Sequence, residues 1–406
     1  MTHKLSITDL DINSNTVLMR VDFNVPLDKK ANITDATRIA ESLRSIKYVL
    51  DKGGALILMS HLGRPKGKRV PEMSLAPCAQ KLSEMLGKEV VMAPDCVGAE
   101  VEALARDLKP GQIMLLENLR FHRGEEHPDE DPNFAKQLAA LGDLYVNDAF
   151  GTAHRKHASN VAITQYFPGK AAAGFLMEKE IRFLGAALLN PKRPFYAIIG
   201  GAKISSKIGV IKALLTKVDA LFIGGGMAYT FLKAQGIEIG ESIHEDDLIP
   251  EALGILEAAK KSNAKLFLPV DSLVAEKIEQ GAPTQVAELT PGAGVPQGEM
   301  GVDIGPKTIE IFSQELRNAE TLFWNGPLGI FEIGSFAKGT DKIAEVVAEL
   351  QGTTIVGGGD SVAALQAGGY AGRISHISTG GGASLEYIEF GELPGIEALS
   401  ESKASV

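Results

Sequence analysis

Short runs of apolar and β-branched residues alternate along this chain with longer segments in which apolar residues recur at helical spacing. Such alternation is typical of strand–helix units built on a parallel sheet. In the first half, strands are predicted at Thr16–Val21, Ala55–Ser60, Glu89–Met92, Ile113–Glu117 and Leu144–Asn147. In the second half, they are predicted at Phe195–Ile199, Ala220–Ile223, Lys265–Val270, Thr321–Trp324, Thr354–Val356 and Ile374–Ser378. The pattern therefore favours an α/β fold with parallel sheets.

A helical segment separates the two sets of strands. Between Glu178 and Leu189 the apolar residues recur at helical spacing, and two prolines follow at Pro191 and Pro194. Proline ends helices, so this segment predicts a domain boundary, although an ordinary surface helix fits the pattern equally well. The length of 406 residues also favours two domains, because one hydrophobic core rarely fills so long a chain. Farther along, the stretch from Pro291 to Pro306 is rich in glycine and proline and predicts a long loop.

Composition restricts the partners and the compartment. A net charge of −10 argues against nucleic acid and anionic membranes, whose binders carry basic surfaces. The two cysteines, Cys78 and Cys96, lack metal-ligand spacing and are interpreted as core thiols in a reducing compartment. No apolar stretch of signal-peptide length opens the chain, and the longest nearly apolar run, Ala220–Leu232, is shorter than the ~20 residues that span a bilayer. We expect a cytoplasmic protein without a transmembrane helix.

Glycine-bearing turns follow several apolar runs in the second half. They are Gly200-Gly201, Gly224-Gly225-Gly226, Asn325-Gly326-Pro327, Gly357-Gly358-Gly359 and Gly380-Gly381-Gly382. A strand, a glycine turn and a helix together expose backbone N–H groups to an anion. Asp360 could then reach a Mg²⁺ ion shared with substrate phosphates, or simply cap a helix. The fingerprints of P-loop and dinucleotide folds are both absent, so phosphate binding rests on these turns.

Two lysines follow the first of these turns. On a helix opening at Ile204, Lys203 and Lys207 would lie on one face, four residues apart. An anion between them would relieve their repulsion, and phosphoryl transfer requires such cations. A solvated helix face with two unrelated lysines remains the alternative.

In the first half, forked and charged side chains lie at or shortly after the predicted strand ends. They are Asp22, Asn24, Arg38, His61, Arg64, Arg120 and Arg155. Strand ends of a parallel sheet meet at one edge, and arginine binds carboxylate and phosphate in a bidentate manner. This set predicts a small polyanionic substrate, although each arginine alone fits a surface ion pair. His122, His154 and His157 are interpreted as structural or exposed.

No residue stands out as a general base. If the group that accepts the phosphoryl is a carboxylate, it is already ionised at neutral pH and needs no general base. Positioning of the substrates and charge neutralisation would then suffice for the transfer.

Eight ordered motifs resemble those of the phosphoglycerate kinase family over essentially the whole chain. They are Arg20-Val-Asp-Phe-Asn-Val-Pro26, Ser60-His-Leu-Gly-Arg-Pro65, Glu117-Asn-Leu-Arg-Phe-His122, Asp148-Ala-Phe-Gly-Thr-Ala-His-Arg155, Gly200-Gly-Ala-Lys203, Trp324-Asn-Gly-Pro327, Gly357-Gly-Gly-Asp360 and Ser378-Thr-Gly-Gly-Gly-Ala-Ser384. The resemblance implies a glycolytic kinase that uses magnesium and transfers a phosphoryl group between ATP and 3-phosphoglycerate. It also implies two doubly wound, Rossmann-like domains joined by a hinge helix, with the active site in the interdomain cleft.

The resemblance assigns roles by position. Residues 1–174 would bind phosphoglycerate, 175–190 would form the hinge, 191–392 would bind nucleotide, and 393–406 would return to the first domain. Phosphoglycerate would be held by Asp22, Asn24, Arg38, His61, Arg64, Arg120 and Arg155. The nucleotide would be bound by Lys203, Lys207, Glu332 at the ribose, Gly358, Gly359, Asp360 with the magnesium, Ser361, Gly380, Gly381 and Gly382. Arg38, Lys203 and Lys207 would be catalytic, and position 361 carries Ser where the family often has Thr.

We expect a monomer that closes over its substrates. Two alternatives remain open from the sequence: a non-catalytic two-lobe protein that binds phosphate or nucleotide, and an unusual nicotinamide dehydrogenase, whose fingerprint is missing.

Overall fold

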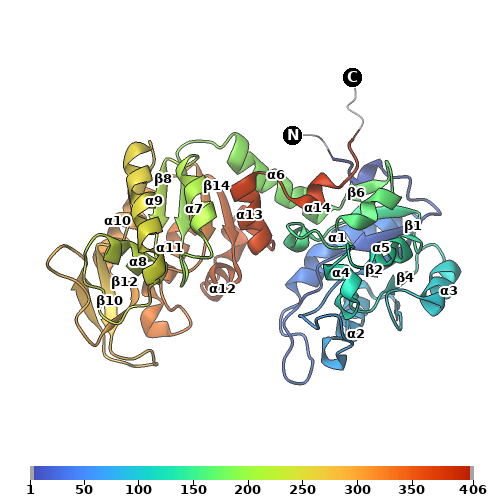
Figure 1. The fold of residues 1–406 in the computed structure, drawn as a ribbon, viewed down its shortest axis with the longest axis horizontal. Coiled ribbons are helices and arrows are strands. Elements are labelled where there is room, and N and C mark those ends of the chain that lie inside the picture. The colour runs from blue at the N-terminus through green and yellow to red at the C-terminus, as the bar shows by residue number, and fades with distance from the viewer. Residues whose placement is uncertain (1–3, 403–406) are drawn as a thin grey trace. The chain divides into compact units, whose positions relative to one another are not determined.

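The computed structural model describes residues 4–402, which fall into two compact units (Figure 1). Unit 1 comprises Met1–Arg182 and Glu392–Val406, and unit 2 comprises Phe183–Gly391. Each unit contains a six-stranded sheet whose neighbouring strands all pair in parallel. The predicted α/β fold with two parallel sheets is therefore confirmed.

The sheet of unit 1 has the order β3-β4-β2-β1-β5-β6. Its strands are β1 (Thr16–Arg20), β2 (Ala55–Met59), β3 (Val90–Met92), β4 (Ile113–Leu115), β5 (Leu144–Asn147) and β6 (Ala171–Ala173). The helices of unit 1 are α1 (Thr37–Asp51), α2 (Ala76–Leu86), α3 (Ala99–Asp107), α4 (Arg123–Glu126), α5 (Pro132–Ala139) and α14 (Pro394–Glu397). Short 3₁₀ turns are η1 (Ile7–Asp9), η2 (Pro71–Met73), η3 (Leu119–Phe121), η4 (Phe150–Thr152) and η5 (Ala162–Tyr166). Strands β2, β3 and β4 lie on one side of β1, whereas β5 and β6 lie on the other side. The position between β1 and β5 is therefore a topological switch point, where parallel sheets bind ligands.

One strand of this sheet was not predicted. β6 consists of three alanines, and alanine favours helix when its surroundings are ignored. Here the residues pair with β5 and are fully covered, so the sheet edge decides their conformation.

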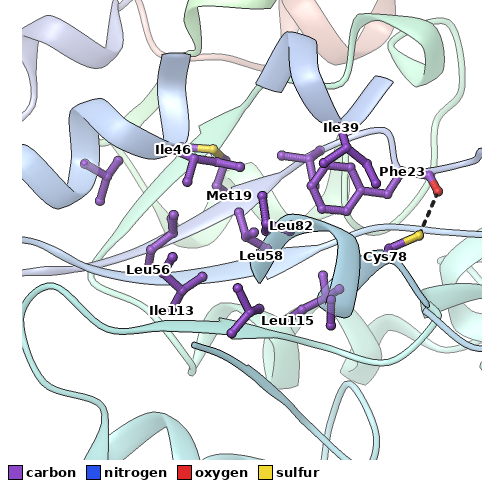
Figure 2. Packing of buried hydrophobic residues seen from close by; sticks show 14 of the residues in the cluster. Met19, Phe23, Ile39, Ile46, Leu56, Leu58, Cys78, Leu82, Ile113 and Leu115 are labelled. Carbon is purple, nitrogen blue, oxygen red and sulfur yellow. Dashed lines mark hydrogen bonds between the residues drawn. The ribbon is translucent and has the colours of Figure 1, made fainter. Parts of the chain in front are cut away.

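The core of unit 1 follows the two-residue period of its strands. Met19 of β1 packs with Leu56 and Leu58 of β2 against Ile46 of α1 and Leu82 of α2 (Figure 2). Leu18 lies between the inward residues of β1 and is buried outside this cluster. Both faces of the sheet are therefore covered, as continuous apolar runs in parallel strands require.

The last part of the described chain contacts unit 1. The Gly395 amide donates to the Ala153 carbonyl at 2.7 Å, and the Ser400 amide donates to the Ala171 carbonyl at 2.9 Å. The Leu5 amide donates in turn to the Ser400 carbonyl at 2.8 Å. These contacts lie within the stretch expected to return to the first domain, and residues 403–406 of that stretch lie outside the described residues.

The helix predicted near the middle of the chain is α6 (Phe175–Leu189), and the boundary between the units falls within it. It begins three residues before Glu178, where the apolar spacing predicted its start, and at the first residue of the hinge range that the resemblance implies. Asp148 explains the earlier start, since its Oδ1 accepts hydrogen bonds from the amides of Leu176 at 2.9 Å and Met177 at 3.2 Å.

Unit 2 has a large sheet of order β15-β14-β13-β7-β8-β9. Its strands are β7 (Phe195–Ile199), β8 (Ala220–Ile223), β9 (Lys265–Phe267), β13 (Thr321–Asn325), β14 (Thr353–Gly357) and β15 (His376–Ser378). Its helices are α7 (Ile208–Leu215), α8 (Met227–Ala234), α9 (Ile249–Lys261), α10 (Pro306–Leu316), α11 (Lys338–Glu349), α12 (Gly359–Ala367) and α13 (Gly382–Phe390), with 3₁₀ turns η6 (Asp246–Leu248), η7 (Gly334–Phe336) and η8 (Ala371–Arg373). All six strands coincide with predicted ones, and the order reverses between β7 and β13.

A three-stranded antiparallel sheet of order β11-β10-β12 was missed. It consists of β10 (Asp271–Ala275), β11 (Gln285–Glu288) and β12 (Met300–Ile304). The long loop predicted from Pro291 to Pro306 is therefore wrong where β12 runs. Gly301 and Asp303 lower the strand propensity of β12, and pairing with β10 overrides it.

Among residues 4–402, no helix has both the length and the apolar character needed to cross a bilayer.

Candidate functional site

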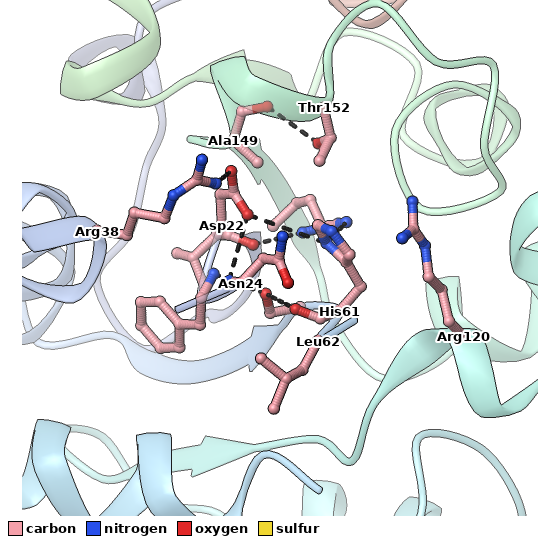
Figure 3. A network of polar contacts seen from close by, with 12 residues as sticks. Asp22, Asn24, Arg38, His61, Leu62, Arg120, Ala149 and Thr152 are labelled. Atoms are coloured by element: carbon pink, nitrogen blue, oxygen red, sulfur yellow. Dashed lines mark hydrogen bonds and ion pairs between the residues drawn. The ribbon is translucent and has the colours of Figure 1, made fainter. Parts of the chain in front are cut away.

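The polar residues that follow β1 and β2 come together in unit 1 (Figure 3). Arg38, near the start of α1, forms an ion pair with Asp22. Asn24 accepts a hydrogen bond from the Gly63 amide at 2.9 Å, while Nη1 of Arg120 donates to the Gly63 carbonyl at 2.8 Å. The predicted residues Asn24, Arg38 and Arg120 thus contact the two loops that follow β1 and β2.

Two of the predicted arginines make fewer contacts. Arg155 is half-buried, and its charge lowers the pKa of His154 and of His157, which places it beside them. Arg64 is exposed and forms no hydrogen bond or ion pair with the described residues. Both side chains can therefore turn toward a ligand without breaking a hydrogen bond or ion pair to the described residues.

A fully buried arginine lies beneath this cluster. Nε of Arg20 donates to the Ser159 hydroxyl at 2.9 Å, and Nη2 lies 3.2 Å from Nδ1 of His61. An arginine can only donate, so Nδ1 of His61 accepts and the ring proton lies on Nε2. Glu125, also fully buried, lies 3.9 Å from Arg20 and balances its charge.

The histidines of this cluster are held neutral. Burial and the charges of Arg20, Arg120 and Arg38 lower the pKa of His61 well below its usual value. Burial and nearby arginines likewise lower the pKa of His154 to about 4 and that of His157 to about 3. Nδ1 of each of these two rings is buried without a hydrogen-bond partner among the described residues. The arrangement offers fixed positive charge together with unused polar atoms, which suits an anionic ligand.

Sequence reasoning did not select Arg20, and it interpreted His154 and His157 as structural or exposed. A signal for Arg20 was present, because it opens the run that contains Asp22 and Asn24. The burial that neutralises the two rings comes only from the folded chain.

The glycine turns of unit 2 lie at one edge of its large sheet. Asn325 at the end of β13 pairs with Ile199 of β7 on one side and with Gly357 of β14 on the other. Gly357 pairs in turn with Ser378 of β15. The turns that begin at Gly200, Gly326, Gly358 and Gly380 therefore leave neighbouring strands at the same level.

Close backbone approach explains one of these glycines. Gly225 has a φ of +68°, and a Cβ atom there would lie 2.7 Å from both the nitrogen and the oxygen of Gly201. Any other residue would force the two turns apart.

The predicted geometry of the lysine pair is wrong. Helix α7 begins at Ile208, so Lys203 and Lys207 precede it and share no helical face. Glu245 accepts from the amide and the hydroxyl of Ser205, at 3.0 and 2.6 Å, and holds this segment in a turn. Lys203 stays exposed, whereas Lys207 turns inward.

Lys207 lies at the switch point between β7 and β13. Its Nζ donates to the Gly200 carbonyl at 2.7 Å and to the side-chain oxygen of Asn325 at 2.8 Å. Burial lowers the pKa of Lys207 to about 8, and the charge of Asp360 opposes this effect. A bound anion would restore the charge that burial disfavours.

Two helix starts face this edge. Gly358, with a φ of +89°, precedes α12, and Gly381, with a φ of +54°, precedes α13. The first amides of both helices have no partner within the helix and carry its positive end. Ser361 is buried, and its hydroxyl accepts a hydrogen bond from the Gly326 amide at 2.6 Å, which joins the turn after β13 to the first turn of α12.

Asp360 fits the one-carboxylate pattern of magnesium binding. It lies in the first turn of α12, is exposed, and has no hydrogen bond or ion pair within the described part of the chain. Mg²⁺ in such sites is held by one or two carboxylates together with substrate phosphates. The residues therefore fit the ion.

A cavity of about 390 Å³ opens beside Asp360. Its lining includes Gly201, Gly226, Leu328 and Glu332. The volume lies in the range of sites that hold small molecules, and mostly apolar walls with a few polar groups suit a planar base. Sequence reasoning named Glu332 here but could not identify the apolar walls, because they come from separate segments such as Tyr229, Ile243 and β12.

Comparisons with known proteins agree over the whole length. The profile of the family described as phosphoglycerate kinase matches residues 7–391. A phosphoglycerate kinase of Moorella thermoacetica is 55% identical over 398 residues, covering 98% of this chain and 99% of that protein. A wheat (Triticum aestivum) protein named "Phosphoglycerate kinase, cytosolic" is 52% identical over 400 residues, covering 98% of each chain.

Solved structures are similar over the same length. The phosphoglycerate kinase of Coxiella burnetii superposes with a TM-score of 0.86 at 39% identity, covering 97% of this chain and 98% of the other. That of Pyrococcus horikoshii OT3 gives a TM-score of 0.84 at 31% identity with the same coverage.

Proposed function

This chain belongs to the phosphoglycerate kinase family, and we propose that its two units divide the two substrates of that reaction between them. The activity is reversible phosphoryl transfer between ATP and the carboxylate of 3-phosphoglycerate, which gives ADP and 1,3-bisphosphoglycerate. The proposal is supported by one observation above all: in each unit, the predicted ligands follow the carboxyl ends of the parallel strands, the edge at which such sheets bind ligands.

Unit 1 binds 3-phosphoglycerate in this proposal. Its ligands are Asp22, Asn24, Arg38, His61, Arg64, Arg120 and Arg155. The arginines supply forked donors to carboxylate and phosphate, and the Nε2 proton of His61 supplies a neutral donor. Arg20 takes no part in direct binding, because it is buried and fully engaged, but it fixes the His61 tautomer.

Unit 2 binds the nucleotide. The base lies in the cavity, Glu332 accepts from the ribose hydroxyls, and the phosphates meet the amides of Gly358, Gly359, Ser361 and Gly380–Gly382. Lys203 and Lys207 face the terminal phosphate. Kinases of this family generally use Mg–ATP, and Asp360 would hold the magnesium ion, which neutralises phosphate charge when bound.

In this proposal, phosphoryl transfer depends on positively charged side chains and not on a general base. The acceptor carboxylate is ionised at neutral pH, so no proton has to be removed before it attacks. Arg38, Lys203 and Lys207 stabilise the charge that spreads over the oxygens of the moving group. In-line transfer requires the reacting atoms within ~3 to 3.5 Å, so the proposal includes a closure that brings the two bound substrates together.

The proposal extends to the oligomeric state, the partners and the location of the protein. Each substrate site is formed by one chain, which supports action as a monomer. Net charge −10 disfavours nucleic acid and membrane partners, and the two free cysteines fit a cytoplasmic location.

The test is a coupled assay of ADP release. Release should require both 3-phosphoglycerate and Mg²⁺, and Asp360→Asn should raise the Mg²⁺ concentration needed for half-maximal rate. ADP release that is independent of 3-phosphoglycerate would refute the acceptor, and an unchanged Mg²⁺ requirement in Asp360→Asn would refute the role of Asp360.

A further inference from the structure

Three side chains of metal-ligating type that have no assigned part in the kinase reaction come together in unit 1. Asp95 and Cys96 follow β3, and His122 follows η3 after the neighbouring strand β4. Their ligand atoms, an oxygen, a sulfur and a nitrogen, all lie within 4.8 Å of one another. We propose that Asp95, Cys96 and His122 bind a thiolate-preferring divalent cation such as Zn²⁺, for which Cd²⁺ is the probe.

The distances suit such an ion. Three atoms pairwise within 4.8 Å fit inside a circle of radius 4.8/√3, or about 2.8 Å. Zinc lies about 2.0 to 2.3 Å from its ligands, so the side chains need to close by less than about 1 Å. Oδ1 of Asp95 and Nε2 of His122 form a hydrogen bond of 2.7 Å. The ion would replace this hydrogen bond, and the two atoms would move slightly apart to bind it.

The ligand set selects the class of metal. Thiolate and imidazole favour zinc-like ions, whereas Mg²⁺ prefers oxygen ligands and keeps its waters. Three protein ligands leave a fourth tetrahedral position for water. The ion can enter from solvent, because the side chains of Asp95 and His122 are 35% and 33% exposed, and Cys96 forms the buried floor.

Charge balance favours binding. One carboxylate and one thiolate together neutralise a divalent cation, and imidazole adds none. Nη1 of Arg69 lies 3.9 Å from Asp95, but this arginine is 58% exposed and can turn toward water.

The ligands are held in place before any ion arrives. The His122 ring stacks on Phe134, with centroids 5.3 Å apart and planes 20° apart. Oδ1 of Asp95 also accepts from the Cys96 amide at 2.7 Å, which fixes the carboxylate beside the thiol. Side chains fixed in this way lose little entropy on binding.

Binding exchanges one proton for the ion. The Cys96 S–H bond breaks, a metal–sulfur bond forms, and the proton passes to solvent. The His122 proton moves from Nε2 to Nδ1, so Nε2 can bind the ion. No oxidant or reductant is needed.

The test uses the full chain without a polyhistidine tag, titrated with Cd²⁺ in excess Mg²⁺. We expect one Cd²⁺ per chain, an ultraviolet cadmium–thiolate absorption band, and no displacement by Mg²⁺. Cys96→Ser should abolish the band, and His122→Gln should weaken binding at least about tenfold. Cys78→Ser is the matched control, because Cys78 is equally buried but lies in the hydrophobic core, where its thiol donates to the Phe23 carbonyl at 3.6 Å (Figure 2).

Several results would overturn the proposal. They are the absence of a band, a band that survives Cys96→Ser or disappears in Cys78→Ser, and equal Cd²⁺ affinity in His122→Gln and the unaltered chain. If Cys96→Ser fails to fold, His122→Gln decides alone, since it alters a side chain that is one-third exposed.

Discussion

At the scale of single residues, the proposed anion site of unit 1 depends on the buried residues beneath it as much as on the arginines assigned to the ligand. Arg20 is fully buried, yet it sets the tautomer of His61 and contributes to the lowered pKa of His61 and His157. A neutral histidine with a fixed proton donates in one direction only, which adds orientation to the attraction of the arginines. The charge and the geometry of the site therefore come from different residues.

Arg38 is expected to act mainly on the transition state. Arg38→Ala should lower kcat by about three orders of magnitude, as loss of an arginine that stabilises a moving phosphoryl group does. Lys47→Ala, which removes an exposed cation from the same helix, is the control and should leave kcat near normal. Steady-state kinetics with near-normal turnover in Arg38→Ala would exclude this role.

Lys207 should make the rate sensitive to alkaline pH. Its pKa is lowered to about 8 by burial, so the ammonium is charged below that pH and neutral above it. The kcat/KM for nucleotide should therefore fall about tenfold per pH unit above pH about 8. Lys207→Arg, whose side chain stays charged, should remove this decline from the pH profile, whereas Lys203→Arg should keep it. An identical decline in Lys207→Arg would assign it to another group.

At the scale of elements, prediction succeeded where a local pattern was strong and failed where pairing decided the outcome. The central strands β7 and β8 of the large sheet in unit 2 are continuous apolar runs, so their positions could be predicted from the sequence. β6 and β12 could not, because their alanines, glycine and aspartate become strand only beside β5 and β10. The helix expected at Ile204 starts later, because Glu245, distant in the chain, holds Ser205 in a turn.

The contact between β12 and α11 should make stability depend on pH. Asp303 of β12 is buried, and its carboxylate accepts from the Gly339 amide of α11 at 2.6 Å. Burial raises the pKa of Asp303 from 3.8 to about 7, so the folded chain holds a proton that the unfolded chain has lost. This contribution to the free energy of unfolding should fall by about 1.4 kcal/mol per unit as pH rises from 4 to 7, and then level off.

Urea unfolding at several pH values between 4 and 7 measures this effect. Asp303→Asn should show a flatter dependence than the unaltered chain. Asp247→Asn, which removes the same charge from an exposed position in unit 2, should not. Parallel curves for all three proteins would contradict the role of Asp303.

At the scale of the whole molecule, the charge is unevenly distributed. The chain carries −10 overall, yet Arg20, Arg38, Arg120 and Arg155 act together on the histidines of one cluster. Phosphoglycerate binding should therefore weaken severalfold as ionic strength rises from about 0.05 to about 0.3 M, because salt screens these charges. Calorimetry checks this, with uncharged adenosine as the control ligand for unit 2. Equal phosphoglycerate affinity at both ionic strengths would argue against the cluster.

The sequence by itself determined the two parallel sheets, the positions of most of their strands along the chain and the candidate ligands at the strand ends. It could do so because strand period, proline position and glycine turns are local properties, and strand ends of a parallel sheet always meet at one edge. Tertiary structure decided which side chains are buried, and with them the neutral histidines, the inward turn of Lys207, the cavity walls and the meeting of Cys96 with His122. Those features depend on desolvation and on contacts between distant segments, which no local pattern encodes.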